Sequence, residues 1–312
     1  AYSKSMVTDV PPVLPQPQQD TLNRMAASVK KWGAPMYSNG YICRLPGRTD
    51  QMSHYDMNLN YFDELLRHFS YNADEDLMRY MWPYIQLHHE WEKRNFDADG
   101  DHLYDAYCCI WASDALYYNG GAVTHSSAYN YMSNLMTARI AEIIGEDPAP
   151  YRQEAEAILA AMNERLWMED LGYWAEFQDY MGHKRLHKSA AIWSVYTPID
   201  CGVGTPEQAY RATRYVDRNI PHIPVRYSYD RKKVKELGLD LPKPEKDLFT
   251  ISTTDWLPYV WSINNVAHEE VAHMALAYLQ AGRNDVGFKL LKADLLDEMY
   301  LGAGSGNFGQ VS

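Results

Sequence analysis

Helical segments joined alternately by short turns and long loops are the feature that most constrains the fold of this 312-residue chain. The short connections are 145–150 and 282–284, and the long connections are 95–121, 168–188 and 220–260. Helical hairpins arranged around one axis need this alternation, because their short turns then gather on one face and their long loops on the other. Long loops inside a compact domain usually carry function. The sequence therefore predicts an all-α toroid of helical hairpins.

Nine helices are predicted from apolar residues at helical spacing and from capping signals. They span residues 22–32, 55–69, 74–91, 124–145, 151–166, 189–200, 206–219, 266–281 and 284–299. Thr205, Pro206 and Gln208 match a capping box with proline at the first helical position. Gly145 stands where a left-handed C-cap belongs. The stretches between these helices are interpreted as irregular loops.

Two segments of the chain differ in composition. Residues 1–20 contain several prolines among polar residues and are expected to form an extended lead-in. Residues 21–312 are expected to form one (α/α)6 domain. Six hairpins need more helices than the sequence contains, so we expect the domain to continue beyond Ser312 in a longer parent chain.

The composition excludes several classes of protein. The chain is 46% hydrophobic, which is too apolar for disorder beyond its ends. No stretch approaches the roughly 20 apolar residues of a membrane helix. The formal net charge of −12 argues against nucleic-acid binding, since phosphate contacts need a basic surface. The 25 Tyr and 9 Trp, against 7 Phe, suit a surface that binds ligands both apolar and hydroxylated, or they fill a large helical core.

One long loop contains the densest polar cluster of the chain. Asn95, Asp97 and Asp99 fall at positions 1, 3 and 5 of a calcium-binding loop, with Gly100 at position 6. Position 12 is Ala106, where such a loop has a bidentate glutamate. The alternative, which the sequence favours, is an Asp/Gly turn that caps a helix, so no metal is expected here.

His268 and His273 lie in a segment that resembles the zinc-binding His-Glu-x-x-His motif. In that motif the histidines are four residues apart and share one helix face. Here they are five residues apart, which places the second about 140° around the helix from the first. Neither a zinc site nor a cofactor is expected.

Carboxylates flanked by Trp and Tyr are the candidate catalytic groups. Partial burial raises a carboxyl pKa, so such an acid can hold a proton near neutral pH. Asp114 lies near Trp111 and alternatively caps a helix, while Glu176 lies near Trp174 in a loop. The candidate substrate-binding residues, chosen because aromatic rings stack on sugars and amides bind hydroxyls, are Tyr104, Trp111, His125, Trp174, Trp193, Trp256, Trp261, Asn264 and Asn265.

Several of these segments together resemble the six-hairpin (α/α)6 glycosidases. The segments are Asp99–Tyr107, Trp111–Ala115, His125–Tyr131, Gly145–Asp147, Trp261–Val266 and Gln280–Arg283. Their order is an Asp-Gly loop and an acidic aromatic loop before a long inner helix. This order is similar to that superfamily and, more narrowly, to the DUF4450 family of bacterial glycosyl hydrolases. The resemblance covers nearly the whole chain after residue 50 and implies an (α/α)6 fold and glycosidase activity.

The resemblance also implies where the catalytic pair lies. The general acid is expected in the loop that matches residues 99–115. One alignment selects Asp105 and another selects Asp114, and Asp105 is slightly favoured because the Asp-Gly turn before it can aim it into the cavity. The partner carboxylate, a base or nucleophile, lies late in such domains. It therefore falls beyond this chain or is Glu176 or Glu270.

Three functions remain open from the sequence. The favoured one is a glycoside hydrolase that acts on a poly- or oligosaccharide with two carboxylates. The others are a non-catalytic carbohydrate-binding toroid and a different (α/α)6 sugar enzyme, such as a lyase or a histidine-dependent epimerase. The histidines that keep the last option open are His54, His125, His183 and His187. A carbohydrate is the expected partner, and a periplasmic or extracellular location is expected.

Overall fold

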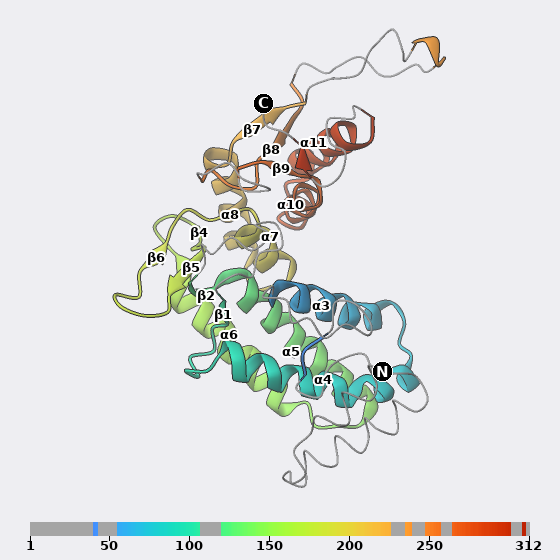
Figure 1. Ribbon diagram of the computed structural model, residues 1–312, viewed down its shortest axis with the longest axis vertical. Coiled ribbons are helices and arrows are strands. Elements are labelled where there is room, and N and C mark those ends of the chain that lie inside the picture. Colours follow the sequence, from blue (N-terminus) through green and yellow to red (C-terminus); the bar gives the residue numbers. More distant parts are fainter. Residues whose placement is uncertain are drawn as a thin grey trace. The chain divides into compact units, whose positions relative to one another are not determined.

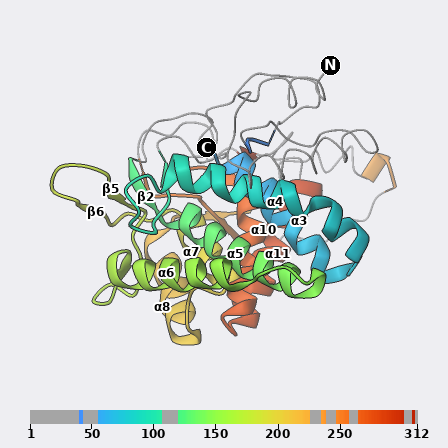
Figure 2. The same ribbon diagram turned by 90° about the horizontal axis from the view of Figure 1, so that it is seen from below.

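The computed structural model describes residues 40–42, 55–106, 120–225, 235–238, 247–256, 264–300 and 308–309. These residues divide between two compact units. The first unit contains the described residues up to 106 together with 120–162, and the second contains the described residues from 163 onward. Figures 1 and 2 show that helices dominate both units.

Helices α3, α4, α5 and α6 make up most of the first unit. Their bounds are Tyr55–Tyr71, Glu75–Phe96, Thr124–Ile144 and Ala149–Arg165, the last residues of α6 belonging to the second unit. Helix α5 packs against α3 and α4. Apolar side chains of these three helices, including Phe62, Ile85 and Ile140, form a buried core. A hairpin of two short strands, β1 (Asp105–Ala106) and β2 (Gly121–Val123), leads into α5.

Helix ends in the first unit follow the local signals of the sequence. Asp74 caps α4, because its Oδ1 accepts a hydrogen bond from the backbone N–H of Leu77 at 3.0 Å. Gly145 ends α5 in the left-handed conformation, with φ of 79°. Both ends agree with the predicted bounds to within one residue.

The second unit has a different set of helices, packed around α10. They are α7 (Trp193–Asp200), α8 (Pro206–Asn219), α10 (His268–Gln280) and α11 (Asn284–Leu295), followed by the π-helical turn η2 (Leu296–Tyr300). Helix α10 packs against α7, α8 and α11. The predicted capping box is confirmed at α8: Thr205 accepts from the N–H of Gln208 at 3.2 Å, and the Gln208 side chain accepts from the N–H of Thr205 at 2.9 Å.

The long loops of the second unit contain short antiparallel strands, so the interpretation of these stretches as irregular is wrong. Val266 and Ala267, predicted to begin a helix, also form a strand, and the helix begins at His268. The pairs are β3 (Trp167–Met168) with β4 (Tyr173–Trp174), β5 (Phe177–Asp179) with β6 (Leu186–His187), β7 (His222–Pro224) with β8 (Phe249–Ile251), and β9 (Val266–Ala267) with β10 (Phe308–Gly309). Strands of two or three residues are too short to show the alternation that identifies a strand in a sequence. The helix predicted to begin at residue 189 begins at Trp193.

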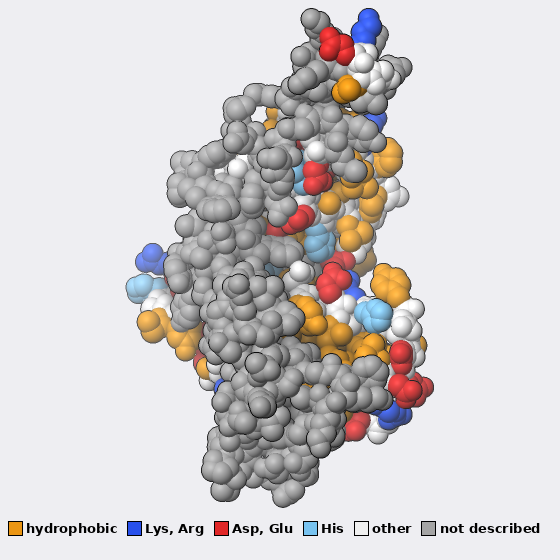
Figure 3. Space-filling model, turned by 45° about the vertical axis from the view of Figure 1, so that its right-hand side comes forward, with side chains coloured by type: hydrophobic (Ala, Val, Ile, Leu, Met, Phe, Trp, Pro, Cys, Tyr) orange, Lys and Arg blue, Asp and Glu red, His pale blue; other side chains and the backbone are white. Residues whose placement is uncertain are grey.

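Helices α10 and α11 bury one face and expose the other. Val271 and Met274 are fully buried, whereas the exposed apolar side chains of the two helices are Leu276, Leu279, Phe288 and Leu295. Figure 3 shows hydrophobic side chains on the described surface. Among the described residues, no helix combines the length and the apolar character that crossing a membrane requires.

Gly287 sets how closely α10 and α11 approach each other. A Cβ at this position would lie 2.8 Å from the backbone oxygen of Ala275 and 2.9 Å from Cγ of Leu279. Alanine normally stabilises a helix relative to glycine by about 1 kcal/mol. The steric conflict with a backbone atom should cost more than that, so we expect Gly287→Ala to lower the free energy of unfolding by about 1–2 kcal/mol net. Urea denaturation measures the change.

The matched control for this substitution is Gly120→Ala. No described atom lies within 4 Å of a Cβ placed at Gly120, so we expect a change within about 0.5 kcal/mol. Equal or higher stability of Gly287→Ala would show that the two helices can move apart without cost.

Candidate active site

Glu176 is a buried candidate catalytic carboxylate whose two oxygens both accept hydrogen bonds. It lies between β4 and β5 and is only 1% exposed. Its Oε1 accepts a hydrogen bond from Nε1 of Trp193 at 2.6 Å, and its Oε2 accepts one from the backbone N–H of Ala191 at 2.8 Å. Both partners are N–H donors, which is the arrangement that suits an ionised carboxylate.

Burial dominates the acidity of Glu176. Removal from water raises the pKa of this carboxyl from 4.5 to about 7, while the backbone of Ala191 and the side chains of Ser194 and Trp193 offset part of that rise. A carboxyl with this pKa exchanges its proton near neutral pH, which is the property required of a catalytic acid or base. The sequence predicts such a shift for carboxylates beside aromatic rings, and the structure provides it at Glu176.

Two chain segments hold the partners of Glu176 in place. The backbone N–H of Ile192, at the start of α7, donates to the carbonyl of Thr253 at 3.0 Å. The N–H of Thr253 in turn donates to the carbonyl of Asn265 at 2.8 Å. The start of α7 is therefore tied to Thr253 and, through it, to the candidate sugar-binding residue Asn265.

Trp256 and Asn264 are the partly exposed candidates of this group. The Trp256 ring meets that of Trp193 edge to face, with centroids 5.9 Å apart, and its Nε1 donates to the carbonyl of Ser189 at 2.8 Å. Asn264 adopts a left-handed conformation with φ of 54°, and its neighbour Asn265 is buried. The structure thus places Glu176, Trp193, Trp256, Asn264 and Asn265 in segments that are joined by direct contacts.

Glu270 contacts the same helix as Glu176. It is buried in α10, and the hydroxyl of Tyr196 donates to its Oε2. Tyr196 and Trp193 are three residues apart in α7, so they lie on one face of that helix. Two buried carboxylates therefore contact the same face of α7 through an aromatic side chain each.

Trp174 is placed differently from its predicted role. It is fully buried, its ring meets that of Trp167 edge to face at a centroid distance of 4.7 Å, and it packs against Gly204. The Trp174 ring therefore has no solvent-exposed face on which a sugar could stack. Its role here is to pack in the hydrophobic core.

The candidates of the first unit are Asp105, Tyr104 and His125. Asp105 begins β1 opposite Ala122 and is half-buried. Tyr104 is buried, and its hydroxyl lies 3.4 Å from Oε1 of Glu154, to which it donates. His125 is buried in the first turn of α5. The remaining candidates, Asp114, Trp111 and Trp261, lie outside the described residues and stay predictions.

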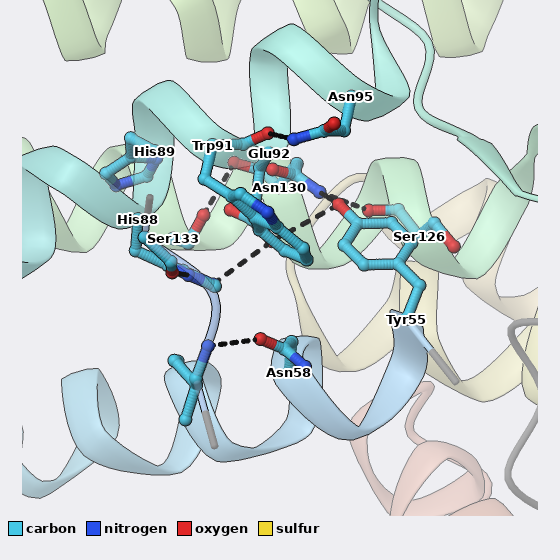
Figure 4. A network of polar contacts seen from close by, with 12 residues as sticks. Tyr55, Asn58, His88, His89, Trp91, Glu92, Asn95, Ser126, Asn130 and Ser133 are labelled. Carbon is cyan, nitrogen blue, oxygen red and sulfur yellow. Dashed lines mark hydrogen bonds and ion pairs between the residues drawn. The ribbon is translucent and has the colours of Figure 1, made fainter. Parts of the chain in front are cut away.

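A buried polar network in the first unit contains a carboxylate that sequence analysis missed. Glu92 is fully buried in α4, and its Oε1 accepts from the hydroxyl of Tyr55 at 3.2 Å (Figure 4). The amide of Asn130 donates to the same hydroxyl at 2.9 Å, and Nε2 of His88 lies 3.5 Å from Oε1 of Glu92. The signal that could have found it is the spacing of His88 and Glu92, four residues apart among buried residues of α4.

The histidines of the zinc-like segment have separate partners. Nδ1 of His268 lies 2.7 Å from Oδ1 of Asp294, and both residues are buried. Nε2 of His273 lies 3.3 Å from Oδ2 of Asp200, and its ring stacks on Tyr196. These contacts fit the five-residue spacing, which places the two rings on different sides of α10.

Two of the histidines considered for an epimerase, His183 and His187, lie in the second unit. Nε2 of His187 lies 2.7 Å from Oδ1 of Asp179 in an exposed contact, and the His187 ring stacks on Phe177. His183 is exposed in the turn between β5 and β6. His54 lies outside the described residues.

Comparison with solved structures gives several matches to the fold. A rhamnosidase from Klebsiella oxytoca with rhamnose bound is 16% identical, with a TM-score of 0.56, over 88% of this chain and 45% of the rhamnosidase chain. An uncharacterized conserved protein from Thermus thermophilus is 11% identical, with a TM-score of 0.61, over 93% of this chain and 83% of that one. A GH63 mannosylglycerate hydrolase from the same organism, in complex with Tris, is 11% identical, with a TM-score of 0.56, over 90% and 82%.

These matches confirm the predicted all-α fold class, since they include (α/α)6 glycosidases. At such low identity the likeness concerns the fold alone. The chain spans less than half the length of the rhamnosidase that it matches. No protein-family model matches the sequence, and no curated protein matches it.

Proposed function

We propose that this chain provides the (α/α)6 domain of a glycoside hydrolase that cleaves a poly- or oligosaccharide with a pair of carboxylates. The observation that carries the proposal is Glu176, a buried carboxyl with a pKa of about 7 that is fixed by two N–H donors. The solved glycosidases of similar fold support it. The resemblance to the DUF4450 family stays a prediction.

The hydrogen bonds of Glu176 favour one of the two catalytic roles. Donation from Ala191 and Trp193 to both oxygens stabilises the ionised form, and an ionised carboxylate acts as a general base or as a nucleophile. We therefore propose Glu176 as the base or nucleophile, and the general acid expected at Asp105 or Asp114 stays a prediction.

The substrate class is tested with activated glycosides. We propose a hexose or deoxyhexose glycoside, because the solved relatives in fold hold rhamnose or are described as a mannosylglycerate hydrolase. The 4-nitrophenyl glycosides of α-rhamnose, α-mannose and α-glucose should be incubated with the full-length protein. Turnover of at least one is expected. Saturable binding of sugar without turnover of any substrate would favour the carbohydrate-binding toroid.

The pH profile tests the role of Glu176. A base or nucleophile works when ionised, so kcat/KM is expected to fall about tenfold per pH unit below a pKa near 7 and to level off above it. The measurement is kcat/KM for the best aryl glycoside between pH 5 and pH 9. A profile that instead falls as the pH rises through 7 would assign Glu176 the role of general acid.

A further inference from the structure

Three carboxylates converge in the turn between α4 and β1. One oxygen each of Asp97, Asp99 and Asp101 lies within 4.8 Å of those of the other two. Oxygen ligands of calcium lie about 2.3–2.6 Å from the ion, so two ligands of one ion are at most about 5 Å apart. The spacing of the three carboxylates therefore matches ligands of a single ion.

Asp97 provides an independent indication that a cation belongs in this turn. Its side chain is fully buried, and its Oδ1 accepts from the N–H of His102 at 3.1 Å. Among the described residues, its Oδ2 has no hydrogen-bond partner. Nζ of Lys93 forms a long ion pair with this oxygen at 4.0 Å, and its hydrogen bond goes to Glu154. A buried carboxylate oxygen without a donor is costly unless a charge satisfies it.

The backbone of the turn directs the three carboxylates to one place. Gly100 and His102 both adopt positive φ, at 70° and 64°. The N–H of Gly100 donates to the carbonyl of Asp97 at 3.2 Å, and Oδ1 of Asp101 accepts from the N–H of Leu103 at 3.0 Å. The chain thus curls around the side chain of Asp97.

We propose that Asp97, Asp99 and Asp101 bind a calcium ion. The three ligands are all oxygens, which suit hard cations. Calcium accepts irregular oxygen shells, whereas magnesium requires near-octahedral geometry. These ligands are shifted by two residues from the calcium-loop positions considered in the sequence, which began at Asn95. Asn95 is not available as a ligand, because it is turned back onto its own helix and its Nδ2 donates to the carbonyl of Trp91 at 2.6 Å.

A second grouping of side chains around Asp97 is less suited to an ion. His102 and Glu154 also lie near Asp97, but Nδ1 of His102 is 3.3 Å from Oε1 of Glu154, and Glu154 accepts from Lys93. The side chains of His102, Glu154 and Lys93 therefore already form hydrogen bonds with one another. An imidazole ligand would also point to a transition metal such as zinc, which the test below includes.

The ion would stabilise the segment that follows it. Beyond Asp101 the chain reaches Tyr104, whose backbone N–H donates to Oγ of Ser127 at 3.0 Å, and β1 begins at the next residue. Calcium would therefore fix the turn that connects α4 to β1. The proposal does not depend on the proposed glycosidase function.

Isothermal titration calorimetry of the chelator-treated full-length protein with CaCl₂ tests the site. We expect one site with a Kd between about 10⁻⁶ and 10⁻⁴ M and a rise of a few degrees in Tm with excess calcium. Asp99→Asn and Asp101→Asn should each weaken binding at least about tenfold, since a charged ligand is lost. Both side chains reach the surface, so these variants should fold even if Asp97→Asn does not.

Asp76→Asn is the matched control, because Asp76 is an exposed acidic residue of the same unit at the start of α4. Its calcium affinity should equal that of the unaltered protein. Three results would overturn the proposal: no calcium heat or Tm shift at 10 mM, equal affinity in Asp99→Asn and Asp76→Asn, or tighter binding of ZnCl₂ than of CaCl₂ that is lost in His102→Gln.

Discussion

Glu176→Gln is expected to lower kcat/KM for aryl glycosides by about 10²–10⁴-fold, which is the range for loss of a positioned acid–base group. Glutamine keeps the shape and can still accept from Trp193, but it cannot be ionised or form a glycosyl bond as a nucleophile. The rising limb of the pH profile near 7 should disappear with it, because the titrating group is gone. Steady-state kinetics from pH 5 to pH 9 measure both effects.

The control for this substitution is Glu164→Gln. Glu164 is an exposed glutamate near the end of α6 in the same unit, so the variant changes the charge equally without touching the candidate site. Its kcat/KM should match the unaltered protein. A purely structural role for Glu176 would instead give a Glu176→Gln variant with lowered Tm, unchanged kcat/KM per folded molecule and an unchanged pH profile.

Trp174→Ala is expected to lower the free energy of unfolding by about 3–5 kcal/mol, because truncating a fully buried Trp leaves a large cavity. Urea denaturation measures the loss. Phe288→Ala is the control, since Phe288 is a large aromatic residue of the same unit that is 65% exposed. It should change the stability by less than about 1 kcal/mol. Similar losses in the two variants would contradict the burial of Trp174.

A double-mutant cycle tests the contact of Trp174 with Gly204 if the alanine variant does not fold. A Cβ at Gly204 would lie 2.6 Å from Cη2 and 3.2 Å from Cζ2 of Trp174. Gly204→Ala alone should therefore cost about 1–3 kcal/mol. Phenylalanine lacks both of those ring atoms, so Gly204→Ala should cost less in a Trp174→Phe background. Additive effects would show that the two residues do not touch.

The sequence predicted most of the described helices because their signals are local. The capping box at Thr205, the glycine at 145 and the apolar spacing of α5 each involve residues within a few positions of one another. The short strands β3 to β6 were missed because they lack such local signals. They are held by pairing between segments, and two or three residues carry no periodic pattern.

The sequence also selected Glu176 and several of the aromatic residues around it, because a carboxylate beside Trp and Tyr is visible in one dimension. It did not rank Glu176 above Glu270. It also missed Glu92, because the spacing of His88 and Glu92 is a weak signal and the donor Tyr55 lies in another helix. Trp174 was likewise chosen as a sugar-binding residue by type, while its full burial against Gly204 comes from the packing of β4.

By itself, then, the sequence determined the helical character of the chain, several of its helix ends and the kinds of side chain that could bind and cleave a sugar. Only the tertiary structure decided which carboxyl is buried and which donors hold it. The physical reason is that helix formation depends on neighbours along the chain, whereas the pKa of a buried carboxyl depends on desolvation and on groups brought to it from other segments. Glu176 illustrates this, since its pKa of about 7 is set by burial and by donors 15 and 17 residues away.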